Sequence, residues 1–172
     1  MSETWSGGCQ CGAVRYELLE RPTGAHLCHC RMCQKQFGSM FAALAGVTKD
    51  KFRMTRGQMS NFRSSADVQR GFCKDCGTPL TYEPLNRGNI SVAISTLDRH
   101  SEIKPEVQYG TEAREPWFDE LHQLPAYPSG EDQNGGLDFA LLLPGIKASS
   151  RQHPDADTRH WPVTNKDDEH HG

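Results

Sequence analysis

Hydrophobic and polar residues alternate along several short stretches of this chain. The alternation is clearest over residues 14–18 and 90–94, and shorter versions of it occur over 52–54, 68–72 and 80–82. A period of two places successive side chains on opposite faces of an extended backbone, so each stretch predicts a β-strand with one buried face. Because the stretches are short and are separated by turns that contain glycine, the pattern favours antiparallel sheets.

Two segments depart from this alternation. The residues from Met40 to Val47 are continuously apolar, which predicts a strand that is buried on both of its faces. The residues from Arg31 to Phe37 are instead spaced like a short helical turn. The pattern therefore predicts a mainly β fold with one short helical turn.

The composition divides the chain into three parts. Residues 1–128 contain all of the predicted strands, and we expect them to form one domain. Residues 129–148 are predicted to be a linker and docking segment, because a stretch of glycine and polar residues is followed by the apolar run 137–143. That run is expected to pack against the domain as a strand or a helix. Residues 149–172 are polar, and we expect this tail to be disordered.

Charge and hydropathy argue against several classes of protein. The formal net charge is -3, whereas a nucleic-acid binder carries an excess of Lys and Arg. The longest apolar run is far shorter than the roughly 20 residues of a membrane-spanning helix. The first eight residues lack the basic and apolar regions of a signal peptide. We therefore expect a cytoplasmic protein without nucleic-acid or membrane partners, whose thiols stay reduced.

The seven cysteines lie in three tight clusters, and none follows Cys76. An odd number in close clusters does not suit a disulfide scaffold, and in a reducing compartment such clusters more often bind metal. The first and last clusters are each followed by a glycine, which allows the tight backbone turn of a zinc knuckle. Together they predict one closed structural zinc site, with the ligands Cys9, Cys11, Cys73 and Cys76.

The middle cluster supplies the other three thiols, Cys28, Cys30 and Cys33. Three protein ligands leave one coordination position open, which is the pattern of a catalytic zinc site. Two alternatives are open at this point. Cys30 or Cys33 could be a redox-active thiol of low pKa, or a histidine could complete a second closed structural site. The candidate histidines are His26, His29, His100 and His122.

The segments 7–16, 28–33 and 72–80 carry these cysteines with characteristic flanking residues. Together they resemble the glutathione-dependent formaldehyde-activating enzyme family, which includes centromere protein V. The resemblance runs from about Trp5 to Pro128. It implies a fold of small zinc-containing antiparallel sheets, packed as a compact complex β-sandwich. It also implies the same division of the cysteines into one structural and one catalytic zinc site.

The activity that gives this family its name joins glutathione and formaldehyde to S-hydroxymethylglutathione, which is carbon–sulfur lyase chemistry in reverse. The resemblance therefore implies a zinc-dependent enzyme that acts on a small thiol, with glutathione as co-substrate, and a small aldehyde. Two features depart from the family. The segment 106–109 lacks the histidine that members often carry there, and the chain continues beyond Leu124-Pro125, where members usually end.

Glutathione carries two carboxylates, so a cation near the catalytic site is expected to bind it. Arg31 is the leading candidate because it lies inside the metal-binding loop, and the other candidates are Arg15, Lys35 and Arg70. His29 could orient a thiolate or transfer a proton.

Two mechanisms and a second class of function are open at this point. The zinc could hold the substrate thiolate, or it could polarise the aldehyde carbonyl while the thiol attacks from outside. In the second class, the protein is a non-catalytic zinc-stabilised binding module, and its acidic, His-containing tail recruits a partner.

Overall fold

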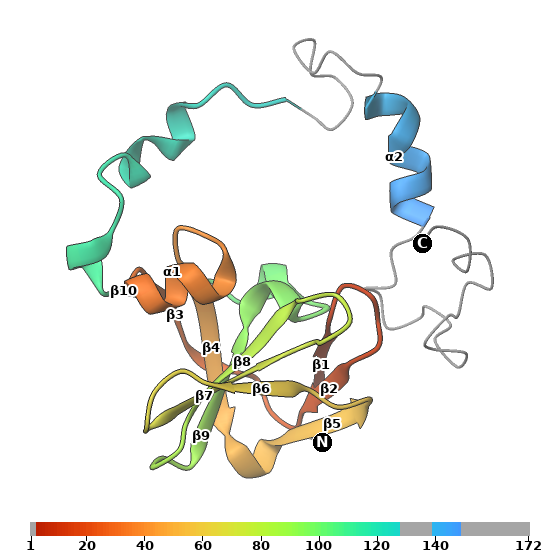
Figure 1. Ribbon diagram of the computed structural model, residues 1–172, viewed down its shortest axis with the longest axis vertical. Coiled ribbons are helices and arrows are strands. Elements are labelled where there is room, and N and C mark those ends of the chain that lie inside the picture. The colour runs from red at the N-terminus through yellow and green to blue at the C-terminus, as the bar shows by residue number, and fades with distance from the viewer. Residues whose placement is uncertain (1–2, 128–138, 149–172) are drawn as a thin grey trace, which may run out of the picture.

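The computed structural model describes residues 3–127 and 139–148, in which two β-sheets dominate (Figure 1). The smaller sheet has three strands in the order β1-β2-β5, and both of its pairs are antiparallel. These strands are β1 (Trp5–Gly8), β2 (Arg15–Leu18) and β5 (Phe52–Arg56). The predicted alternation is evident in β2, where Tyr16 and Leu18 are fully buried.

The larger sheet has seven strands in the order β10-β3-β4-β9-β8-β7-β6. All of its pairs are antiparallel except one, because β10 lies parallel to β3. The mainly β fold class is therefore confirmed, with one parallel edge strand in addition. The strands are β3 (Thr23–Cys28), β4 (Ala42–Thr48), β6 (Ser60–Arg63), β7 (Val68–Phe72), β8 (Pro79–Pro84), β9 (Asn89–Ala93) and β10 (Val107–Tyr109).

The strand predicted over residues 40–47 begins two residues later than expected. We expected a strand from Met40, but β4 begins at Ala42, and the side chain of Met40 is 42% exposed. The helix before it ends at Gly38, so the chain uses residues 38–41 to turn back toward the sheet. Similarly, β9 ends at Ala93, and Ile94 begins a 3-10 turn instead of continuing the strand.

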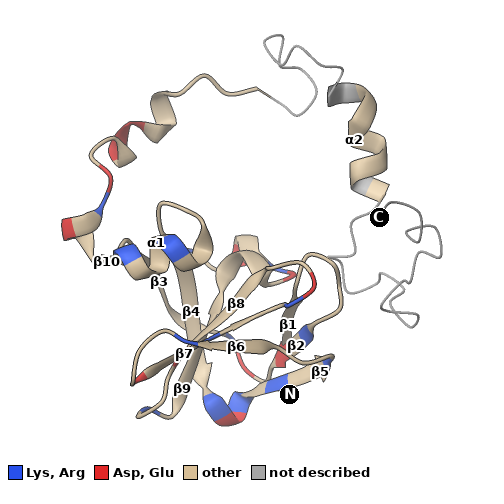
Figure 2. Cartoon of the chain, in the orientation of Figure 1, with Lys and Arg blue, Asp and Glu red and all other residues tan. Residues whose placement is uncertain are grey.

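The helices are short. The helix α1 spans Arg31–Phe37, which confirms the predicted helical turn, and Gly38 ends it with a left-handed φ of 58°. Among charged residues it carries only Arg and Lys (Figure 2). The 3-10 helices are Lys49–Lys51, Ile94–Thr96, His100–Glu102, Thr111–Ala113 and Phe118–Gln123. No helix within residues 3–127 and 139–148 is long and apolar enough to cross a membrane.

The predicted docking segment contains the helix α2 (Phe139–Ala148). Leu141 and Leu142 on this helix are exposed, so its docking against the domain stays a prediction. The predicted linker over 129–136 and the predicted disordered tail over 149–172 lie outside the described residues.

The main hydrophobic core contains side chains from both sheets. Trp5, Tyr16 and Leu18 come from the smaller sheet, and they belong to one buried cluster with residues of the larger sheet such as Leu80 and Val92. The sheets therefore bury their apolar faces in a common core.

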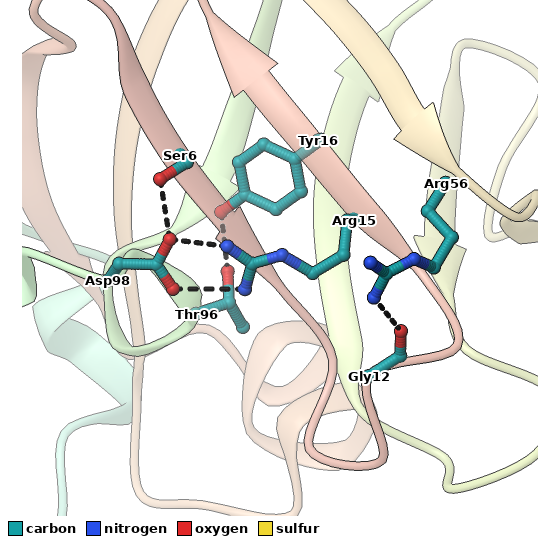
Figure 3. A network of polar contacts seen from close by, with 7 residues as sticks. All are labelled: Ser6, Gly12, Arg15, Tyr16, Arg56, Thr96 and Asp98. Carbon is teal, nitrogen blue, oxygen red and sulfur yellow. Dashed lines mark hydrogen bonds and ion pairs between the residues drawn. The ribbon is translucent and has the colours of Figure 1, made fainter. Parts of the chain in front are cut away.

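A polar network joins the smaller sheet to the segment that follows β9 (Figure 3). The guanidinium of Arg15 on β2 donates to both carboxylate oxygens of Asp98, at 3.0 and 2.5 Å. The Ser6 hydroxyl donates to the same carboxylate at 2.6 Å, and the Tyr16 hydroxyl lies 2.7 Å from that of Thr96. Because Arg15 and Asp98 are almost entirely buried, this network is a fixed joint of the fold.

Candidate metal centres and active-site cavity

The four outer cysteines come together at the tips of two hairpins. Cys9 and Cys11 lie in the turn between β1 and β2, while Cys73 and Cys76 lie in the turn between β7 and β8. Their four Sγ atoms lie within 4.8 Å of one another, with 3.5 Å between Cys9 and Cys11 and 3.8 Å between Cys11 and Cys73. Zinc–sulfur bonds of about 2.3 Å in a tetrahedron would separate the sulfurs by about 3.8 Å. The four residues therefore fit a zinc ion.

The two turns share the backbone geometry of zinc knuckles. Gly12 and Gly77 have φ values of 79° and 75°, which a residue with a side chain rarely adopts. The turns also aim donors at sulfur, since the Val14 amide donates to Cys9 Sγ at 3.2 Å. Burial would raise the pKa of Cys76, but hydrogen bonds from Thr78 and Cys11 together outweigh it and lower the pKa to about 6. The Cys76 turn therefore favours a thiolate, whereas burial raises the pKa of Cys73 to about 11 and also raises the pKa of Cys11.

The three middle cysteines form a second cluster at the junction of β3 and α1. Cys28 is the last residue of β3, Cys30 immediately precedes α1, and Cys33 lies in the first turn of the helix. Their Sγ atoms also lie within 4.8 Å of one another. No histidine ligand atom joins this group in the part of the chain that the structure describes. The donor set therefore fits a zinc ion with three protein ligands better than a closed site completed by histidine.

The strand β10 holds this metal-binding loop from the far side. The backbone amide of His29 donates to the Tyr109 carbonyl at 2.9 Å, and its buried ring has Nε2 2.9 Å from Gln108 Oε1. Gly110, with a φ of 65°, packs so closely that a Cβ there would lie 2.8 Å from the Cys30 nitrogen. His29 thus anchors the loop, and neither of its ring nitrogens belongs to the group of three thiols. This role of Gln108 was not predicted from the sequence, although the segment 106–109 is one of the places where the chain departs from the family.

A cavity of about 840 Å³ lies beside the three-thiol cluster, and all three of these cysteines line it. Its wall is completed by residues of β3, β4, β7, β8, β9 and β10, and polar residues such as Ser64, Ser65 and Asn89 contribute to it. Concave sites of this size, with a few convergent polar groups, are typical of small-molecule binding. The cluster therefore faces a space in which a substrate can lie.

Arg70 is the cation that contacts the three-thiol cluster. Its side chain is only 2% exposed, and its two terminal nitrogens lie 3.7 and 3.6 Å from Cys33 Sγ. Its Nε donates to the Ser64 hydroxyl at 3.1 Å, and the guanidinium lies over the Tyr82 ring. Burial raises the pKa of Cys33 to about 12, and Arg70 opposes this rise. A cation at this position therefore favours the thiolate form of Cys33.

The other predicted cations lie elsewhere. Arg31 is exposed and donates to the Gln34 side chain at 2.6 Å, and with Lys35 it lines a second cavity next to α1. Arg15 is held by Asp98 in the joint between the smaller sheet and the segment that follows β9. The predicted cation that contacts the thiols is therefore Arg70, which we ranked below Arg31 from the sequence.

A comparison with protein families now agrees with these motifs. Residues 4–113 match the model of the glutathione-dependent formaldehyde-activating enzyme family. The chain belongs to this family. The match includes all three cysteine clusters, so the resemblance seen in the sequence is confirmed.

Individual relatives are distant. A protein of Penicillium rubens, provisionally named a glutathione-dependent formaldehyde-activating enzyme, is 34% identical over 46% of this chain and 45% of its own length. A protein of Podospora anserina with the same provisional name is 31% identical over 61% of this chain and 51% of its own length. An uncharacterized lyase of Schizosaccharomyces pombe is 28% identical over 49% of this chain and 61% of its own length. The chain thus spans about half the length of the curated relatives it matches.

Among solved structures, a Rhodobacter sphaeroides protein from structural genomics is 25% identical to this chain. The match covers 60% of this chain and 98% of that protein, with a TM-score of 0.49.

Proposed function

We propose that this protein is a zinc-dependent enzyme of the carbon–sulfur lyase type, which adds a small thiol such as glutathione to formaldehyde or a related small aldehyde, or catalyses the reverse. The observation that carries the proposal is the three-thiol cluster, whose members all line a cavity of about 840 Å³. Membership of the formaldehyde-activating family supports the same reaction.

The reaction needs no oxidant or reductant. The thiol sulfur attacks the carbonyl carbon and forms one carbon–sulfur bond, and the thiol proton ends on the former carbonyl oxygen. A zinc ion held by Cys28, Cys30 and Cys33 would supply Lewis acidity and an open coordination position beside the cavity.

The protein's own groups prepare this site in two ways. Arg70 directs its guanidinium at Cys33 and so stabilises the thiolate that the metal needs. Gln108 and Gly110 hold the loop that carries Cys28 and Cys30, which keeps the thiols in place without contributing a ligand.

The cavity supplies hydrogen-bonding partners for a peptide-like thiol. The hydroxyls of Ser64 and Ser65 and the amide of Asn89 line it. Arg31, the predicted glutathione-binding residue, does not line this cavity and lies in the neighbouring groove.

The four outer cysteines have a different proposed role. A zinc ion bound by Cys9, Cys11, Cys73 and Cys76 would hold two hairpins of different sheets together, which is a structural function. The residues from 1 to 128 would then be the zinc-containing domain, followed by the linker and docking segment 129–148 and the tail 149–172.

Metal analysis and activity of Cys30→Ser test the proposal. Purified wild-type protein is expected to contain two zinc ions per chain and to consume formaldehyde only when a thiol is present. Cys30→Ser is expected to lose one ion and this activity while its thermal unfolding changes little. Ser39→Ala, an exposed change just after α1, is the matched control and should behave like the wild type.

Two results would contradict the proposal. One is a wild-type protein with a single zinc and the middle thiols unligated, and the other is full activity in Cys30→Ser. Two bound ions without activity toward any thiol and aldehyde would favour a zinc-stabilised binding module instead.

A further inference from the structure

A second cavity of about 760 Å³ lies between α1 and the edge of the larger sheet, formed by β6 and β7. In this pair of strands Phe62 lies directly opposite Arg70, and Ser60 lies opposite Phe72. Since alternate residues of a strand share a face, Phe62, Arg70 and Phe72 lie on the same face. The two phenylalanines, together with Met32 from α1, give this groove a largely apolar lining.

The charges along the groove all have the same sign. Arg31, Lys35 and Arg70 line it, and no Asp or Glu does. None of these three cations forms an ion pair with a carboxylate in residues 3–127 and 139–148. Arg31 and Lys35 are four residues apart on α1, so they lie one helical turn apart on one side of the helix. The groove therefore has the charge to bind an anion.

The exposed phenylalanine points to the chemistry of that anion. Phe62 is 56% exposed on β6, which is one of the two edge strands of the larger sheet. Edge strands are usually protected by charged or proline residues, and exposed apolar patches often mark binding sites. An anion with an apolar body would cover Phe62 and Phe72 while its charge meets the cations of α1.

The groove adjoins the cavity of the three-thiol cluster. Met32, Ser64 and Arg70 line both spaces, and Arg70 contacts Cys33 from the position between them. A molecule whose sulfur lies at the cluster can therefore extend past Arg70 into the groove.

From these observations we infer that the groove binds an apolar organic carboxylate, and that this group is the distal part of the thiol substrate. The inference rests on the proposed function, and it names a thiol class different from glutathione. Glutathione is polar along its whole length, whereas the groove offers apolar side chains between Arg70 and the cations of α1. The preferred thiol is thus an apolar thiol carboxylate.

Calorimetry with the zinc-loaded full chain tests the groove without any reaction. The probe is 4-phenylbutanoate, and 4-phenylbutanamide is its uncharged match. The carboxylate is expected to bind at least about tenfold more tightly than the amide, because cations without carboxylate partners line the groove. Phe62→Ala and Lys35→Gln should each weaken carboxylate binding several-fold.

Matched changes outside the groove provide the controls. Tyr127→Ala removes another exposed aromatic ring, and Lys104→Gln removes another lysine charge; neither residue lines the groove. Both should bind the probe like the wild type. Equal binding of acid and amide, no binding at all, or equal effects of the groove and control variants would each overturn the inference.

Kinetics then test whether the groove ligand is the substrate. With formaldehyde, 3-phenyl-2-sulfanylpropanoate is expected to have a lower KM than glutathione, and Phe62→Ala should raise that KM several-fold with little change for glutathione. A lower KM for glutathione overturns the substrate class. If no thiol supports formaldehyde consumption, the proposed function fails and the substrate assignment with it, whereas probe binding still decides separately whether the groove binds a carboxylate.

Discussion

The two cysteine clusters use the same donor atom but differ in how the chain assembles them. The four-thiol cluster joins the β1–β2 turn of one sheet to the β7–β8 turn of the other. The three-thiol cluster is local, since its members are separated by at most five positions at the end of β3 and the start of α1. The four-thiol cluster thus connects distant segments of the fold, whereas the three-thiol cluster connects only neighbouring residues and lies beside a cavity.

The groups that surround the two clusters also differ. Around the four-thiol cluster, backbone amides and the Thr78 hydroxyl approach the sulfurs, and these groups belong to the turns themselves. Around the three-thiol cluster, a buried arginine from a different strand approaches Cys33, and a cavity of about 840 Å³ lies alongside. The first cluster is therefore surrounded by groups of its own turns, whereas the second lies beside a cavity and a residue from another strand.

The largest expected effect separates the two clusters directly. Cys73→Ser should remove more than about 4 kcal/mol of stability, because structural zinc supplies folding free energy. Cys30→Ser should cost much less, since its cluster closes only a local loop. Chemical denaturation of both variants measures the difference. Equal losses of stability would show that the clusters do not divide the structural and catalytic roles.

The Arg15–Asp98 joint should show the next largest effect. Asp98→Ala leaves the buried guanidinium of Arg15 without its carboxylate, and breaking such a pair costs about 3–5 kcal/mol. Asp119→Ala is the matched control, because its ion pair with Arg114 is exposed and is worth about 0–1 kcal/mol. Urea unfolding measures both changes, and a similar small cost for the two would mean that the joint does not stabilise the attachment of the smaller sheet to the segment after β9.

A smaller effect is expected from the arginine at the three-thiol cluster. Arg70→Met removes the guanidinium that contacts Cys33 and should lower zinc affinity there about 10–100-fold, the usual range for groups that support a metal ligand. The four-thiol cluster should keep its affinity. Competition with a coloured chelator follows both sites, and Arg31→Met serves as the control. Equal weakening of both sites would contradict a local role for Arg70.

The smallest effect concerns the strand that supports the metal-binding loop. Gln108→Ala removes the hydrogen-bond partner of the buried His29 ring and should cost about 1 kcal/mol of stability. Gln123→Ala, at an exposed position, should cost almost nothing. Thermal unfolding compares the two. If Gln108→Ala matched its control, β10 would not anchor the loop through this contact.

Much of the site could be predicted because its ligands are encoded locally. A glycine after Cys11 and after Cys76 marks the two knuckles, and the six residues from Cys28 to Cys33 hold a complete three-thiol set. The helix Arg31–Phe37 and the strands with clear alternation were likewise predicted, because short-range periodicity determines which face is buried.

The missed features depend on contacts between distant segments. The strand β10 has only three residues and pairs with β3 across about eighty positions, so no local pattern announces it. Arg70 could not be ranked above Arg31 from the sequence, because the pairing of β7 with β8 brings it over Tyr82 and next to Cys33.

The sequence by itself determined the family, the mainly β class and the division of seven cysteines into four and three. Those properties follow from spacing along the chain, where neighbouring residues constrain one another directly. Only the tertiary structure decided which cation faces the thiols, which strand steadies their loop and which cavities adjoin them. Those choices depend on strand order and register, which bring together residues that are far apart in the sequence.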